Sequence, residues 1–167
     1  MSARPVTVLF VCTHNSARSI MAEALLNHLG SGRVQAFSAG SSPTENQQPH
    51  PLALRTLERH GISIEGLFSK NWLAFADLKS PRLDVVITVC DRAAGDACPV
   101  FPDHPALAHW GYEDPSSQEG SDEERDTAFE TTFELLTERV KAFLELPLDQ
   151  MDRTTLGAAC RALATGS

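Results

Sequence analysis

Residues 6–19 read VTVLFVCTHNSARS, an apolar run that passes directly into a polar one. The apolar part, Val6–Val11, is continuous and rich in β-branched residues, which is typical of a strand buried on both faces of a parallel sheet. It is far shorter than the ~20 apolar residues of a membrane span. Although Arg4 precedes it, a buried strand explains the run better than the apolar region of a signal peptide does.

Strand-like and helix-like patterns alternate along the rest of the chain. A strand is predicted over Val34–Gly40 and a clearly buried one over Asp84–Cys90. Further predicted elements are helices from about Ile20 to Leu29 with Gly30 as the stop, at His50–His60, at Asn71–Leu78 and at about Asp152–Leu163, and a short strand at Ala106–Trp110. A capping box at Ser121–Glu124 predicts the start of a long helix. Its apolar stripe consists of Phe129, Phe133, Leu136, Val140 and Phe143.

This alternation predicts an α/β fold with a mostly parallel sheet. The length of 167 residues favours a single domain over residues 1–167. Ligands on such sheets bind beyond the carboxyl ends of the strands. Both clear strands end on a cysteine there, Cys12 and Cys90, so this edge is the expected location of the functional site.

Charge and cysteine content narrow the function classes. The chain has 22 acidic and 14 basic residues and a formal net charge of −8. We therefore expect neither a nucleic acid nor a membrane as the partner, because both repel a negative surface. Four cysteines are too few for a disulfide scaffold. These features favour a cytoplasmic protein whose specially placed thiols serve catalysis or metal binding.

The polar turn after the first strand has the form C-x5-R, from Cys12 to Arg18. Between a strand and a helix, such a loop aims its N–H groups inward and places an anion at the helix N-terminus. Arg18 adds a planar fork for two oxygens of a tetrahedral oxyanion. The same positive field favours a nucleophilic Cys12 thiolate, to which Ser19 can donate a hydrogen bond. The predicted oxyanion-binding residues are Thr13, His14, Asn15, Ser16, Ala17, Arg18 and Ser19.

Two of these loop residues have open or supporting roles. His14 either contacts the anion or shapes the rim of the loop, and the sequence favours neither. Asn15 is expected to hold the loop in a strained conformation through its side chain, a role for which asparagine is suited.

The stretch Val8–Cys12, with Arg18-Ser19 and Met21–Ala24 after it, resembles the low-molecular-weight protein tyrosine phosphatase superfamily. The resemblance runs from about Val6 to Leu146. It implies a three-layer fold with a four-stranded parallel sheet flanked by helices. It also implies that Cys12 is the nucleophile, that Arg18 and the loop amides bind the oxyanion, and that Asp114, before Pro115, is the general acid.

Within the superfamily the chain resembles the arsenate reductases. The phosphatases place an aromatic pair after the Asp-Pro, whereas Ser116 and Ser117 stand here, and neither stacks on a phosphotyrosine ring. A cysteine after the second clear strand, Cys90, and the run from His109 to Pro115 are what the reductases have. A phosphatase acting on proteins or small phosphoesters is the alternative enzyme, and a binding module that senses oxyanions is the alternative from another class.

The resemblance implies a relay of thiols without a metal or flavin. Cys12 attacks arsenate, Cys90 then attacks the Cys12 sulfur so that arsenite leaves, and Cys98 captures Cys90. The reductant is thioredoxin or, alternatively, glutaredoxin with glutathione. Cys98 follows Cys90 by eight residues, where some thioredoxin-coupled relatives have seven, and this difference leaves the reductant open. We expect a monomer.

Three other features have competing interpretations. Cys90, Cys98, His104 and His109 form a zinc set only with spacings unlike those of structural zinc sites. Cys160 is in phase with Leu156 and Leu163 and is predicted to be a core residue. Some relatives carry an acidic residue that helps bind potassium where Lys70 stands here. Lys70 either supplies a tethered positive charge near Asn15, Glu23 and Ser38 or is simply exposed to solvent.

Overall fold

Four parallel strands form one sheet in the order β2-β1-β3-β4. The computed structural model describes residues 5–77, 82–90, 101 and 105–165. The strands are β1 (Val6–Cys12), β2 (Val34–Gly40), β3 (Val85–Thr88) and β4 (Ala106–His109). Cys12 pairs with Gly40, and Thr88 pairs with both Val11 and His109. The carboxyl ends of all four strands therefore meet at one edge, as the predicted α/β class requires.

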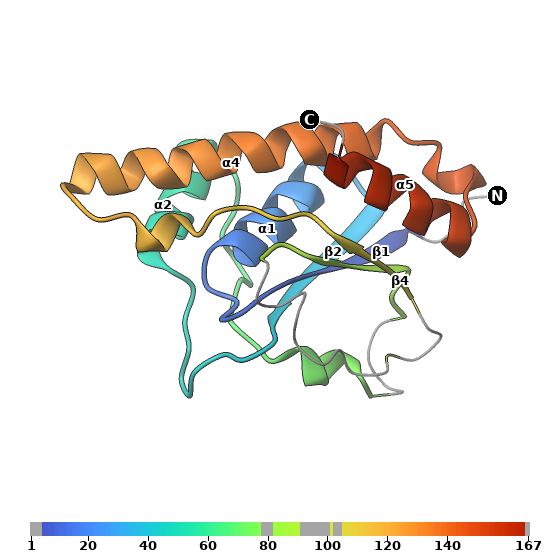
Figure 1. Cartoon of the computed structure of the whole chain (residues 1–167), viewed down its shortest axis with the longest axis horizontal. Helices are drawn as coiled ribbons and strands as arrows, with labels where there is room; N and C mark the ends of the chain where they lie inside the picture. The colour runs from blue at the N-terminus through green and yellow to red at the C-terminus, as the bar shows by residue number, and fades with distance from the viewer. Residues whose placement is uncertain (1–4, 78–81, 91–100, 102–104, 166–167) are drawn as a thin grey trace.

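Helices cover one side of this sheet. They are α1 (Arg18–Gly30), α2 (Pro51–Arg59), α4 (Asp122–Leu144) and α5 (Arg153–Thr165), with single 3-10 turns η1 (Trp72–Phe75), η2 (Pro115–Ser117) and η3 (Leu148–Gln150). Figure 1 shows α4 and α5 along one side of the strands and η1 on the opposite side. Helix α1 lies between α4 and strands β1 and β2. The predicted α/β fold with a four-stranded parallel sheet is confirmed, and of its three predicted layers the described residues show the helices on one side of the sheet and the turn η1 on the other.

The core lies between the sheet and the helices. The capping box is present, because Ser121 accepts from the Glu124 N–H while the Glu124 carboxylate accepts from the Ser121 N–H. The whole predicted stripe of α4 is buried: Phe129, Phe133, Leu136, Val140 and Phe143. Trp110, 1% exposed, packs between Phe10 of β1 and Phe143 of α4, with ring centroids 6.0 and 6.2 Å away. Burial of this apolar face is what stabilises α4 in place.

Most predicted boundaries lie within two residues of those in the structure, and three differences are informative. The helix predicted at Asn71–Leu78 is only the turn η1, which Asn71 caps, and Leu78 lies outside the described residues. Strand β3 ends at Thr88, so Cys90 lies two residues beyond it and not within it. Gly30 is the last residue of α1, and Ser31 adopts the left-handed conformation after it (φ 49°). In each case backbone geometry at the terminus, which apolar periodicity does not report, sets the boundary.

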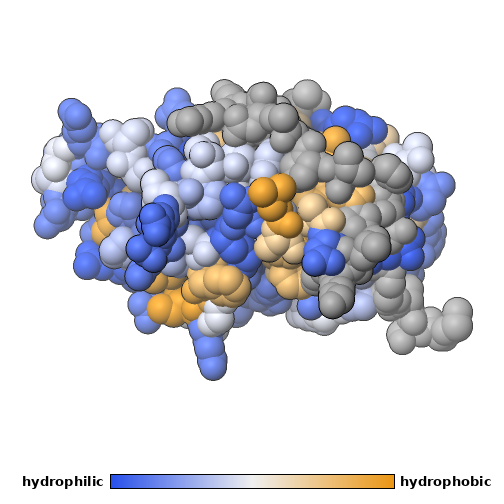
Figure 2. All heavy atoms as spheres, turned by 90° about the horizontal axis from the view of Figure 1, so that it is seen from below, coloured by the Kyte–Doolittle hydropathy of each residue, from blue (hydrophilic) through white to orange (hydrophobic). Residues whose placement is uncertain are grey.

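The surface is mostly polar, with separate apolar areas. Seen from the side of η1, it shows such areas among hydrophilic residues (Figure 2). The large hydrophobic side chains that are at least half exposed are Phe68, Leu73, Leu107 and Leu135. Among the residues described, no helix combines the length and the apolar character needed to cross a bilayer.

The end of β2 fits closely against the turn that follows β1. Gly40 donates its N–H to the Lys70 carbonyl at 2.7 Å, and Ser42 donates to the Thr13 carbonyl at 2.8 Å. A Cβ atom at position 40 would lie 2.7 Å from the Thr13 carbonyl oxygen and 3.1 Å from the Asn15 nitrogen. These contacts are with backbone atoms, so no side chain can move aside to make room. Glycine is required here by close approach of two main chains.

Gly40→Ala is therefore expected to lower the free energy of unfolding by about 1–3 kcal/mol, the usual cost of overpacking. The measurement is urea unfolding followed by circular dichroism. Ser42→Ala is the matched control, because it leaves the Ser42 N–H bond to Thr13 in place. Equal stability of the two variants would contradict the close approach described here.

Candidate active site

The loop between β1 and α1 wraps around the sulfur of Cys12, which is 3% exposed. Asn15 has a positive φ of 57°, a conformation that asparagine tolerates better than most residues. In this conformation its N–H donates to Cys12 Sγ at 3.2 Å. The predicted strain at Asn15 is thus present, and it turns one amide of the loop toward the sulfur.

The side-chain amide of Asn15 fixes the direction of the hydrogen bonds around it. Its Oδ1 accepts from the Lys70 N–H at 2.9 Å, so its Nδ2 is the donor to Ser19 Oγ at 2.8 Å and to Ser38 Oγ at 2.9 Å. Ser19 Oγ lies 2.8 Å from Cys12 Sγ, and when Cys12 is a thiolate, which has no proton to give, Ser19 is the donor of this bond. This hydrogen bond to the charged form stabilises the thiolate.

A half-buried ion pair of Glu23 and Lys70 supports the far side of this network. Ser38 Oγ donates to the Glu23 carboxylate at 2.5 Å, and Lys70 Nζ lies 3.9 Å from the same carboxylate oxygen. Lys70 Nζ donates to the carbonyls of Ser38 and Phe68 at 2.8 and 2.9 Å. Burial raises the pKa of Glu23, which Ser38 and Lys70 partly oppose, and burial also lowers the pKa of Lys70. The structure therefore supports the first interpretation of Lys70, in which it supplies a tethered positive charge beside Asn15, Glu23 and Ser38, and not that of a solvent-exposed lysine.

Arg18 spans the mouth of the loop. Its Nη1 donates to the Tyr112 carbonyl at 3.0 Å, and its Nη2 lies 3.6 Å from Asp114 Oδ2. The other carboxylate oxygen of Asp114 accepts from the Ser116 N–H at 2.9 Å and from Ser116 Oγ at 2.6 Å. Asp114 therefore caps η2 with one oxygen and turns the other toward the loop.

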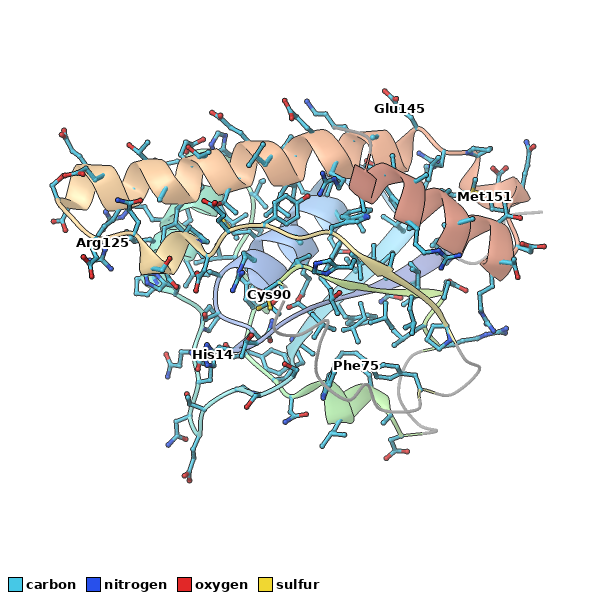
Figure 3. The ribbon with its side chains drawn as sticks, viewed as in Figure 1. His14, Phe75, Cys90, Arg125, Glu145 and Met151 are labelled. Carbon is cyan, nitrogen blue, oxygen red and sulfur yellow. The ribbon has the colours of Figure 1, made fainter. Side chains whose placement is uncertain are left out.

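Cys90 lies at the same mouth. It is 2% exposed, and its Sγ is 3.3 Å from Thr13 Oγ1. A cavity of about 390 Å³ opens there, lined by Thr13, His14, Arg18, Cys90, Tyr112, Glu113 and Asp114. Figure 3 shows Cys90 at the carboxyl ends of the strands and His14 on the rim beside it. A larger hollow of about 1130 Å³ between η2 and α4 has an acidic lining in which the described residues include no cysteine.

Of the two remaining cysteines, the structure describes only Cys160. Cys98 lies outside the described residues, as does His104 of the alternative zinc set. Cys160 is fully buried on α5, its carbonyl accepts from Trp110 Nε1 at 2.8 Å, and burial raises the pKa of its thiol to about 12. A buried, neutral thiol is a core residue, as the sequence predicts for Cys160.

Sequence reasoning missed three contributions to the site. The Tyr112 carbonyl accepts from Arg18, and the absence of a side chain at Gly40 leaves room for the loop backbone. The His50 N–H donates to the Ser16 carbonyl at 2.8 Å. Gly40 had a detectable signal, because a glycine at the end of a strand indicates a close approach of another backbone. The other two are main-chain contacts without a signal in residue type.

Comparison with known proteins agrees with this geometry. A family model described as low molecular weight phosphotyrosine protein phosphatase matches residues 7–155. An arsenate reductase from Shouchella clausii is 37% identical over 138 residues, which cover 83% of this chain and 94% of that protein. A solved structure of an arsenate reductase in its phosphate-binding state superposes with a TM-score of 0.64 at 30% identity, over 83% of this chain and 96% of that one. A thioredoxin-dependent arsenate reductase from Corynebacterium glutamicum gives 0.53 at 30% identity, over 84% and 65%.

Lys70→Met is expected to destabilise the fold increasingly as the pH rises from about 5 to 8. The raised pKa of Glu23 means that the folded state holds this proton more tightly than the unfolded chain, so stability falls as Glu23 ionises. Without the Lys70 charge that loss grows, to roughly 1–3 kcal/mol at pH 8. Urea unfolding at several pH values measures it.

Lys141→Met, at an exposed position of α4, is the control for loss of a lysine. If the stability of Lys70→Met depended on pH in the same way as that of the unchanged protein, the pairing of Lys70 with Glu23 would be contradicted.

Because the positive charge is tethered, we also expect the unfolding midpoint and any turnover to be the same in potassium and sodium salts at equal ionic strength. Activation by potassium would contradict this.

Proposed function

Because this chain belongs to the low molecular weight phosphotyrosine protein phosphatase family, we propose that it reduces arsenate to arsenite with cysteine thiols. The observation that carries the proposal is a second thiol at the mouth of the anion loop. Cys90 Sγ contacts Thr13, the residue after Cys12, and lines the same cavity as Arg18. The relatives named as arsenate reductases support the same conclusion.

The first step forms a bond between Cys12 and arsenic. Arsenate binds in the loop, where its oxygens accept from the loop N–H groups and from the Arg18 guanidinium. The Cys12 thiolate, held by Ser19 and the Asn15 N–H, attacks the arsenic atom. One oxygen leaves as water with a proton from Asp114, whose Oδ2 faces Arg18. The product is a thiol ester of arsenic in which arsenic is still pentavalent.

The second step transfers two electrons. The Cys90 thiolate attacks Cys12 Sγ, so an S–S bond forms and the S–As bond breaks. The electron pair of the S–As bond remains on arsenic, which becomes trivalent and leaves as arsenite. The two thiols together lose two electrons. Thr13 Oγ1, in contact with Cys90 Sγ, can donate to the attacking thiolate.

The third step restores Cys12. We propose that Cys98 attacks Cys90 Sγ, which releases the Cys12 thiolate and leaves a Cys90–Cys98 disulfide. An external dithiol then reduces this disulfide. The thioredoxin-dependent relative supports thioredoxin as that reductant, with glutaredoxin and glutathione as the alternative. Such thiol cycling suits a reducing compartment, so we propose that the protein works in the cytoplasm.

A second candidate function is phosphate-ester hydrolysis by the same loop. It is favoured by Asp114, which precedes Pro115 and faces Arg18 as a leaving-group acid would. Against it, Ser116 and Ser117 follow Pro115 in η2, and neither offers a ring to flank an aromatic substrate. We therefore place arsenate reduction first.

The function is tested by measuring arsenite formed from arsenate, with thioredoxin and thioredoxin reductase or with glutaredoxin and glutathione, beside hydrolysis of p-nitrophenyl phosphate. We expect arsenite to form, and to form faster with thioredoxin than with glutaredoxin. In Cys12→Ser its rate should fall by at least about a thousandfold, because a serine hydroxyl is not ionised near neutral pH. Hydrolysis without arsenite formation would favour the second candidate. Arsenite formation by Cys12→Ser would overturn the assigned nucleophile.

The order of the thiols predicts different outcomes for three variants. In a single-turnover mixture, Cys90→Ser should release very little arsenite, whereas Cys98→Ser should release one arsenite per enzyme and leave a Cys12–Cys90 disulfide. Cys160→Ser, the control in the core, should turn over normally and lose at most about 1–2 kcal/mol of stability. The measurements are arsenite per enzyme and disulfides mapped by mass spectrometry. Sustained turnover by Cys98→Ser with thioredoxin, or a Cys12–Cys160 disulfide, would refute this order.

A further inference from the structure

One histidine links the start of α2 to the back of the anion loop. His50 caps α2, and its Nδ1 accepts from the Leu52 N–H at 3.1 Å. Its own N–H donates to the Ser16 carbonyl at 2.8 Å. Pro51, which has no N–H, occupies the first helical position. The side chain of His50 thus caps the helix, while its main-chain N–H is hydrogen-bonded to the loop.

The bond to Ser16 orients one peptide group of the loop. In a planar trans peptide the C=O and the following N–H point in opposite directions. The Ser16 carbonyl points to His50, so the Ala17 N–H points away from His50. Loss of the cap would leave the extended backbone of His50 (φ −67°, ψ 132°) held to α2 only through its carbonyl, which accepts from the Ala53 and Leu54 N–H groups. The His50 N–H, and with it the Ser16–Ala17 peptide, would then be oriented less firmly.

The cap requires an uncharged imidazole. Nδ1 accepts a hydrogen bond only when it carries no proton. Three groups face the ring: Phe129 of α4 at a centroid distance of 4.8 Å, Arg125 of α4, and Asp114 before η2. Burial is the main cause that lowers the pKa of His50, Arg125 lowers it further, and Asp114 opposes both. The stabilisation from the cap is therefore complete above pH 6.5, and it is lost as the pH falls through the lowered pKa.

We propose that His50 is a positioning residue for the anion loop, and that its protonation in acid releases the cap of α2 together with the Ser16–Ala17 peptide and weakens oxyanion binding. The proposal rests on the proposed function only in that the loop binds a tetrahedral oxyanion. It does not require that arsenate be reduced. Figure 3 shows Arg125 on α4 near the end that approaches η2. Repulsion between Arg125 and a protonated His50 favours release.

The test is the dissociation constant of inorganic sulfate from pH 5 to 8, measured by isothermal titration calorimetry on the reduced protein. Sulfate remains a dianion over this range, so its own charge does not change. His50→Asn keeps a side-chain acceptor at the cap that does not titrate, and His50→Ala removes the acceptor. His60→Asn is the matched control, because His60 lies at the other end of α2 and contacts Glu130 and Phe133 of α4.

At pH 7.5 we expect His50→Asn to bind sulfate within about twofold of the unchanged protein, and His50→Ala to bind about threefold to tenfold more weakly. Toward pH 5 the unchanged protein should approach His50→Ala, while His50→Asn should bind about threefold to tenfold more tightly than either. His60→Asn should follow the unchanged protein throughout. If His50→Ala does not fold, the comparison of His50→Asn with the unchanged protein carries the test.

Parallel curves for His50→Asn and the unchanged protein would overturn the inference. A His60→Asn curve that flattens like that of His50→Asn would also overturn it, since the cause would then be the stability of α2 in general. An absence of sulfate binding at every pH would overturn it as well. Failure to form arsenite overturns the proposed function alone. A sulfate profile that depends on His50 would still support the inference in that case.

Discussion

The side-chain amide of Asn15 is the constraint on which the rest of the site depends. One backbone donor, the Lys70 N–H, occupies its oxygen, so its nitrogen must serve both Ser19 and Ser38. Both hydroxyl oxygens accept from this nitrogen, while Ser38 donates to Glu23 and Ser19 is the hydroxyl that can donate to a Cys12 thiolate. The amide is fully buried, where unpaired polar groups are costly, so alternative arrangements of these protons are strongly disfavoured.

A reductase and a phosphatase require almost the same architecture up to this point. Both bind a tetrahedral oxyanion at a helix N-terminus and both attack it with a thiolate. The difference is in what happens to the covalent adduct. Water can complete a phosphatase cycle, whereas the release of arsenite requires a second thiol beside the first. The strand order places β3, which leads to Cys90, directly beside β1, which ends at Cys12.

Local patterns in the sequence were sufficient for the parts of the fold and site that are continuous in the chain. The buried strand Val6–Cys12, the C-x5-R loop and the capped helix from Ser121 each carry their information within about ten residues, and the structure has all three. The contact between Cys90 and Thr13 depends on strand order, which periodicity does not encode. The His50 N–H and the Tyr112 carbonyl act as main-chain groups that residue type does not reveal, whereas Gly40 acts through its lack of a side chain. Their roles depend on which backbones meet in space.

Because β1 and β3 are neighbours, the disulfide formed in the proposed cycle also changes the covalent connectivity of the chain. A bond between Cys12 and Cys90 joins the carboxyl ends of two adjacent strands and closes a covalent ring that contains α1, β2 and α2. Closing a ring of that size removes conformational entropy from the unfolded chain equivalent to about 4.5 kcal/mol. The intermediate that has released arsenite is therefore a cross-linked and more tightly constrained chain than the resting protein. Each catalytic cycle thus takes the polypeptide from an open chain to a closed one and back.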